Sequence, residues 1–158
     1  TNINSCQTKY KSVILPLLTD RGGRLVPKKS GLNQWNAGGR ARNVNEIYIP
    51  IPSWIHKKFP GFFPDRDQVF TLKLPNSGEL SAKVCQEGNK ALMSNPNLDL
   101  GKWLLRDVMS LEERELLTYE KLQIIDIDSV EVYKVNDGEY KIDFRSMGTY
   151  DEFLMDNN

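Results

Sequence analysis

Histidine and cysteine are scarce in this sequence. Its 158 residues include one histidine, His56, and two cysteines, Cys6 and Cys85. A zinc site needs such residues in closely spaced pairs, and a Ser–His–Asp triad would have to use His56 without any nearby nucleophile elbow. His56, Lys57 and Lys58 also lack the spacing and the second copy that the His–Lys motif of phospholipase-D-type hydrolysis requires. The sequence therefore predicts no catalytic centre, no metal and no cofactor.

Long apolar runs are also missing. No stretch approaches the ~20 apolar residues of a membrane span, and 39% hydrophobic with 27% charged residues is typical of a globular protein. We expect one domain over residues 1–158, with residues 1–11 and 146–158 as peripheral tails. The first residues contain no Met and no signal-peptide pattern, so a fragment or processed product of a larger chain is expected. Both cysteines are expected to be thiols in a reducing cytosol, with a disulfide as the alternative.

The formal net charge is zero, but the charges are separated along the chain. Residues 9–42 hold eight basic side chains and one acid, whereas residues 107–158 hold fourteen acids and five bases. Such polarity favours one surface suited to an anion and another turned away from it. The alternative is that charge simply fluctuates along the chain.

Alternating apolar residues predict about six or seven short strands, at 12–18, 46–52, 69–74, 80–85, 130–135 and 140–144. Turn-forming residues at 75–78 and 136–138 predict two hairpins. Short helices are expected at 53–59, with Ser53 as its cap, and at 100–108. Ser110 and Glu113 match a capping box, which predicts a further helix towards Leu117. The pattern indicates a mainly β (α+β) domain, such as a small barrel.

Two polar loops, 19–45 and 86–99, contain the residue types that read duplex DNA. Arg and Lys bind guanine or phosphate, Asn and Gln bind adenine, and glycines let the backbone approach a ligand. A loop as long as the first is rarely an idle connection. Both loops leave strands, so a sheet could hold them as two arms about a groove. The alternative is an ordinary polar surface.

The three tryptophans receive different interpretations. Trp54 heads a short helix and Trp103 lies on an apolar helical face, so both are expected in the core. Trp35 lies between Gln34 and Asn36 in the basic loop and is the one expected to touch a ligand or to brace the loop.

One catalytic alternative remains open. Glu139 and Lys141 form an E-x-K tripeptide downstream of Asp126 and Asp128, and metal-dependent nucleases hold Mg²⁺ with similar carboxylates. E-x-K is common, however, and here it follows a hairpin turn, where alternating charges usually face solvent. We expect these residues to belong to the surface.

Several runs resemble the carboxy-terminal domain of phospholipase-D-type (type II) restriction endonucleases, which is similar to the plant B3 transcription-factor domain. Together these runs cover the chain from Ser12 to Phe144. They are Ser30-Gly-Leu-Asn-Gln-Trp-Asn36, Gly39-Arg40, Arg42-Asn43, Asn45-Glu-Ile-Tyr-Ile-Pro-Ile-Pro52, Phe62-Phe-Pro64, Leu100-Gly-Lys-Trp-Leu-Leu-Arg-Asp-Val108 and Asp128-Ser-Val-Glu-Val-Tyr-Lys134. Gln34 beside Trp35 and the longer stretch 36–39 depart from the usual pattern. The resemblance implies a seven-stranded open pseudobarrel with short helices at its ends.

The resemblance also implies an N-arm within residues 20–43 and a C-arm within residues 86–102, which together grip the major groove. The expected N-arm residues are Asp20, Arg21, Arg24, Lys28, Lys29, Asn33, Gln34, Trp35, Asn36, Arg40, Arg42 and Asn43. The expected C-arm residues are Gln86, Asn89, Lys90, Ser94, Asn95, Asn97 and Lys102.

The expected function is therefore sequence-specific recognition of double-stranded DNA in the service of a restriction endonuclease. The resemblance implies that the hydrolytic centre lies in a separate catalytic domain of the parent enzyme, a partner that can dimerise, in the cytoplasm of a bacterium. No membrane partner is expected. The alternatives are a small Mg²⁺-dependent nuclease using Asp128, Glu139 and Lys141, and a protein- or RNA-interaction domain.

Overall fold

The computed structural model describes residues 11–19, 25–26, 31–33, 45–85, 87–94, 98–113 and 115–157. Its strands are β1 (Lys11–Pro16), β2 (Ile49–Pro50), β3 (Phe70–Lys73), β4 (Glu79–Cys85), β5 (Ala91–Ser94), β6 (Ser129–Asn136) and β7 (Glu139–Arg145). Its helical segments are the 3-10 turns η1 (Gly31–Asn33) and η2 (Glu87–Asn89), the π-helix η3 (Lys102–Val108), and the helices α2 (Ser53–Lys58), α3 (Asp99–Gly101), α4 (Tyr119–Ile125) and α5 (Thr149–Asp156). None of the described helices is long and apolar enough to span a bilayer.

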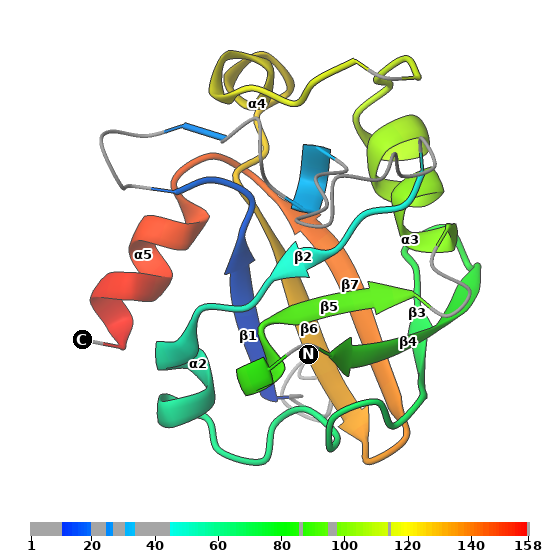
Figure 1. The fold of residues 1–158 in the computed structure, drawn as a ribbon. Helices are drawn as coiled ribbons and strands as arrows, with labels where there is room; N and C mark the ends of the chain where they lie inside the picture. Colours follow the sequence, from blue (N-terminus) through cyan, green and yellow to red (C-terminus); the bar gives the residue numbers. More distant parts are fainter. Residues whose placement is uncertain are drawn as a thin grey trace, which may run out of the picture.

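The seven strands form one sheet that curls into a nearly closed barrel (Figure 1). The strand order is β1-β6-β7-β3-β4-β5-β2, and every pair is antiparallel except β3 with β7. The two edge strands, β1 and β2, approach each other across the remaining seam. This confirms the expected seven-stranded open pseudobarrel with short helices.

Period-two alternation builds the barrel interior. In β6, Val130 and Val132 are completely buried, while the alternate residues Glu131 and Tyr133 are only partly buried. β4 alternates in the same way, with Ala82 and Val84 inside. Successive side chains of a strand point to opposite faces, so this pattern specifies which face closes on the core.

Tyr140 closes one end of the barrel. Its side chain is completely buried, and the rings of Phe62, Phe63 and Phe70 surround it at centroid distances of 5.7, 6.2 and 4.7 Å. Its hydroxyl donates a hydrogen bond to the Phe62 carbonyl oxygen. Burial raises the pKa of Tyr140 to about 12, because the phenolate would lose its hydration there.

Three local predictions were wrong. The loop expected at 86–99 contains β5, which pairs with β4 on one side and β2 on the other, so pairing outweighs its weak sequence pattern. Residues 111–113 and 115–118 are not helical: Ser110 has a φ of 55°, and Thr118 is the N-cap instead, its hydroxyl accepting a hydrogen bond from the Lys121 amide at 3.1 Å. Ser53 is the first residue of α2 rather than its cap, because the cap position is Pro52.

Helix α5 lies within residues 146–158, which were expected to be a tail. It runs beside β1 and reaches α2 (Figure 1). The indole of Trp54 in α2 packs 5.4 Å from the Phe153 ring and donates a hydrogen bond to the Tyr150 hydroxyl at 3.3 Å. Trp54 is therefore half-buried at the rim of the core, whereas Trp103 is buried as predicted.

Candidate nucleic-acid interface

Strand directions place the two expected arms at different points on the barrel. β1, β3, β5 and β7 all finish at one end, where the chain leaves β1 and later enters β2; we call it the N-arm end. The other end carries α2, the β4–β5 connection and the β6–β7 turn; we call it the α2 end (Figure 1).

The expected N-arm is tied to the barrel where it begins. Thr19 and Leu25 exchange two backbone hydrogen bonds of 2.8 and 3.0 Å, which bracket residues 20–24 in the sequence. Val26 and Leu32 then insert into the core, with relative exposures of 8% and 2%. These contacts fix the base of the arm to the rigid sheet.

Asn33 acts as a brace. Its amide oxygen accepts a hydrogen bond from the Leu117 N–H at 2.7 Å, and its amide nitrogen donates one to the Leu117 carbonyl at 3.1 Å. The side chain is 8% exposed. A buried amide paired in this way on the backbone is not positioned to read a base edge, so we assign Asn33 to the support of the arm.

The far end of the same arm is clamped at Asn45. The guanidinium of Arg106 donates to the Asn45 side-chain oxygen at 3.1 Å and to the carbonyls of Leu111 and Glu112 at 3.0 and 2.9 Å. Gly101 lies against the Asn45 backbone, so both contacts come from the stretch formed by α3 and the π-helix η3. π-helical turns are rare and often occur at functional sites.

The remaining N-arm residues fall outside the described residues. They are Asp20, Arg21, Arg24, Lys28, Lys29, Gln34, Trp35, Asn36, Arg40, Arg42 and Asn43. Residues 34–44 join two fixed points, Asn33 and Asn45, and both points are held by residues 101–117.

The expected C-arm divides into two segments at opposite ends of β5. The first is the β4–β5 connection at the α2 end, where the Asn89 carbonyl lies 2.8 Å from His56 Nε2 and the side chain of Lys90 is exposed. The second leads from Ser94 to Lys102 at the N-arm end. Gln86, Asn95 and Asn97 lie outside the described residues.

Ser94 and Lys102 have different environments in the second segment. The Ser94 hydroxyl is 1% exposed and accepts a hydrogen bond from the Leu100 N–H at 2.9 Å, so it orders the start of the helical stretch. Lys102 is exposed, and no acid whose side chain the structure describes lies within salt-bridge distance of it. Lys90 is exposed as well, so both lysines present a positive charge at the surface.

The residues of the nuclease alternative are not brought together. Asp128 is 3% exposed, and its carboxylate accepts hydrogen bonds from the Ser129 hydroxyl and the Gly148 and Tyr150 amides at 2.6, 3.0 and 3.3 Å. Glu139 begins the opposite strand at the other end of the β6–β7 hairpin, roughly 25 Å away by strand rise. Magnesium ligands must meet at about 2 Å from one ion, so Asp128 and Glu139 cannot share one.

Glu139 has an ordinary surface partner instead. Its carboxylate lies 2.8 Å from the Lys73 ammonium, which lowers the pKa of Glu139 and raises that of Lys73. No group of three His, Cys, Asp or Glu side chains within the described ranges could hold a metal ion.

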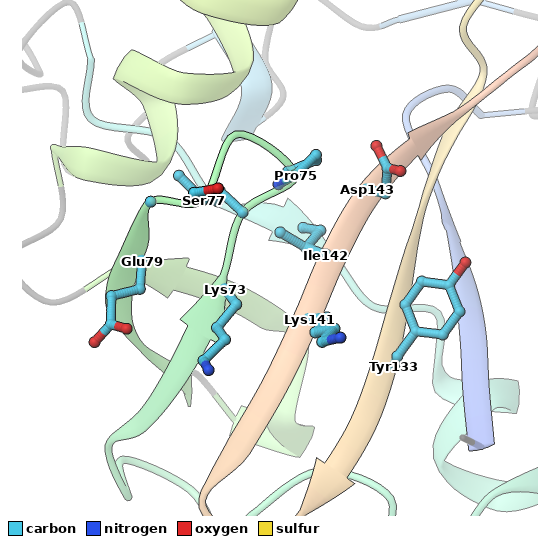
Figure 2. A pocket seen from close by; sticks show the side chains of 10 residues that line it. Lys73, Pro75, Ser77, Glu79, Tyr133, Lys141, Ile142 and Asp143 are labelled. Atoms are coloured by element: carbon cyan, nitrogen blue, oxygen red, sulfur yellow. The ribbon is translucent and has the colours of Figure 1, made fainter. Parts of the chain in front are cut away.

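A hollow of about 450 Å³ lies on the outside of β3, β6 and β7, and Figure 2 shows the side chains that line it. Lys73, Glu79, Lys141 and Asp143 line it, so its charges are mixed and largely compensated. β7 and β3 stand in the middle of the strand order, across the barrel from the β2 edge. Its lining includes the β3–β4 turn but no residue of β2 or β5.

Comparison with known proteins places the chain in a family. A solved structure of a hypothetical Arabidopsis thaliana protein aligns with 90% of this chain and 98% of its own, at 9% identity and a TM-score of 0.41. No curated protein sequence matched the chain. The profile of the family described as the NgoFVII C-terminal B3-like DNA-binding domain matches residues 6–136. That match covers most of the chain, which therefore belongs to this family of B3-like DNA-binding domains.

Proposed function

We propose that this domain reads a short, specific sequence of duplex DNA through the major groove, which it holds between the N-arm and the C-arm. The observation that carries the proposal is that both expected arms join one strand pair, β2 and β5. The chain passes from the N-arm into β2 at Ile49, opposite Leu92, whereas the β4–β5 connection meets the same pair at Pro50 and Ala91. β2 and β5 thus form a short wall, with the N-arm and the second C-arm segment leading from one end and the first C-arm segment from the other.

The size of this wall suits the groove. Strand rise gives roughly 10 Å between Ala91 and Ser94, and the major groove of B-DNA is about 12 Å wide. Arms at the two ends of such a wall can reach the floor and the flanking phosphates of one groove. Because the barrel behind the arms is rigid, the residues that support the arms should lose little conformational entropy when DNA binds.

The side chains of the arms supply the chemistry. Arg21, Arg24, Arg40 and Asn43 are of the types that pair with guanine or adenine edges, and Gln34 and Asn36 add further amides. Lys28, Lys29, Lys90 and Lys102 suit phosphates. Asn33 and Ser94 are left out of this set because their polar atoms are used in bracing the arms.

We further propose that the domain serves a bacterial restriction endonuclease whose hydrolytic centre lies in a separate catalytic domain. The family match to a DNA-binding domain and the separation of Asp128 from Glu139 both support a chain that binds DNA without cutting it.

Paired substitutions in the N-arm test this function. We expect Arg40→Ala to weaken binding to the preferred duplex by about 1–3 kcal/mol and to relax the preference at one base pair. Lys28→Ala should instead weaken all duplexes alike and reduce the salt slope by about one. If both variants bound the preferred and the random duplex with unchanged affinity, the N-arm would not contact DNA.

A further inference from the structure

Helix α2 adjoins the β4–β5 connection, the first segment of the C-arm. His56 Nε2 lies 2.8 Å from the Asn89 carbonyl in the β4–β5 connection, and the Ile51 amide donates to the Lys90 carbonyl at 2.7 Å. Asn89 has a φ of 56°, a left-handed conformation that asparagine tolerates better than most residues. The helix and the connection thus form one surface at the α2 end.

The last turn of α2 is basic, consisting of His56, Lys57 and Lys58. Lys57 and Lys58 are exposed, and neither has an acidic partner within the described part of the chain. Other lysines differ: Lys73 and Lys83 pair with Glu139 and Asp67 at 2.8 and 3.8 Å. The α2 lysines are exposed like Lys90, which lies in the adjoining β4–β5 connection.

Lys57 and Lys58 line a hollow of about 460 Å³ with Trp54, Leu154 and Asn157. None of these lining residues is acidic, although α5 also carries Asp151, Glu152 and Asp156. Basic residues near a helix C-terminus also interact favourably with the helix dipole, which by itself accounts for a modest stabilisation. The interaction with the helix dipole would be the same anywhere on the barrel, so it does not explain why these lysines border the C-arm.

We propose that Lys57 and Lys58 contact the sugar–phosphate backbone of the duplex that flanks the recognised site on the C-arm side. This inference rests on the proposed function. Lys57 follows His56 by one residue, about 100° around the helix, and borders the face that meets Asn89. Lys58 follows Trp54 by four residues and so lies on the helix face that packs against Phe153 of α5, and we expect it to reach phosphates more distant from the site.

The length of the duplex distinguishes a contact with the flanking backbone from a general electrostatic attraction between the lysines and DNA. We would measure dissociation constants by fluorescence anisotropy at several salt concentrations. One set of duplexes carries the preferred site with flanks of about ten base pairs, one helical turn. The other set carries the same site with flanks of only a few base pairs. The variants are Lys57→Gln, Lys58→Gln and the double variant. The matched control is Lys73→Gln with Lys141→Gln, adjacent lysines on β3 and β7 across the barrel.

The double variant should lower the salt slope by about 1–2 and weaken binding several-fold on the long duplex, with little effect on the short one. Its preference for the selected over the random duplex should be unchanged, and Lys58→Gln should need a longer flank than Lys57→Gln. Equal losses on both lengths, or an equal loss from the control pair, would overturn the contact, as would an unchanged salt slope. A wild-type domain without any preference for the selected duplex would instead refute the proposed function, and this inference with it.

Discussion

Gly101 lies so close to Asn45 that a Cβ atom on residue 101 would stand 1.9 Å from the Asn45 carbonyl oxygen. Arg106 holds the Asn45 side chain from the same helical stretch. The return end of the N-arm is therefore set by a backbone-to-backbone contact in which neither partner can move independently. The conformation of Gly101 is ordinary, with a φ of −66°, so space rather than backbone freedom requires glycine there.

Gly101→Ala should reduce the free energy of unfolding by about 1–3 kcal/mol, because the added methyl group must push two backbones apart. It should also weaken binding to the preferred duplex more than binding to a random one, since the N-arm is displaced. Urea unfolding and anisotropy measure the two effects. The matched control is Gly138→Ala, where a Cβ would meet no atom within 4 Å. Equal effects of the two substitutions would contradict the clamp.

Asn33→Ala tests whether this residue braces the arm or reads a base. Loss of two buried hydrogen bonds to Leu117 should cost about 1–3 kcal/mol of stability. Asn33→Asp keeps the acceptor for the Leu117 amide but sets a second acceptor, on a buried carboxylate, against the Leu117 carbonyl, so it should cost at least as much. Under conditions where both variants are folded, a binding-site selection should return the wild-type sequence. A change in the selected base at one position would show that Asn33 reads DNA directly.

Tyr140→Phe tests the closed end of the barrel. Removal of the hydroxyl leaves the Phe62 carbonyl without this donor and should cost about 1–2 kcal/mol near neutral pH.

The wild type should also lose stability as the pH rises from 10 to 12. The unfolded chain releases the tyrosine proton near pH 10, whereas the folded protein retains it until about pH 12. This residue contributes at most about 1.4 kcal/mol per pH unit to that slope. Urea unfolding at several pH values should show a shallower decline for Tyr140→Phe, and parallel curves for the two proteins would contradict the raised pKa.

Glu139→Gln should leave the behaviour of the domain towards DNA unchanged. The substitution removes the ion pair with Lys73, which is exposed, so the melting temperature should change little. Incubation of the wild type with duplex DNA and Mg²⁺ should produce no cleavage that depends on this residue. Cleavage that disappears in Glu139→Gln would restore the nuclease alternative.

Much of the barrel could be predicted because its signals are local. The β6–β7 hairpin follows from the turn at 136–138, where the Asn136 side chain accepts a hydrogen bond from the Gly138 amide at 3.0 Å. β5 could not be predicted, because its four residues are strand only through pairing with β4 and β2. The helix expected after Ser110 competes with the better cap at Thr118, and the buried side chains of Leu111 and Leu117 hold the segment between them in place.

The candidate interface was predictable in its residue types but not in its supports. The basic loop and the amide-rich loop stand out in composition. In the structure the first leads into β2 and the second contains β5, which pairs with β2. The role of Asn33 as a brace depends on Leu117, 84 residues away, which no local pattern reveals. Lys57 and Lys58 were visible as a basic run, but only the His56–Asn89 contact connects that run to the C-arm.

Selection from a pool of random duplexes tests the central claim most directly. The wild-type domain should enrich a short common sequence, and anisotropy at physiological salt should then give an affinity for that sequence at least about a thousandfold above that for random duplex. Recovery of no common sequence, or equal affinity for selected duplex, random duplex and RNA, would contradict sequence-specific recognition by the two arms.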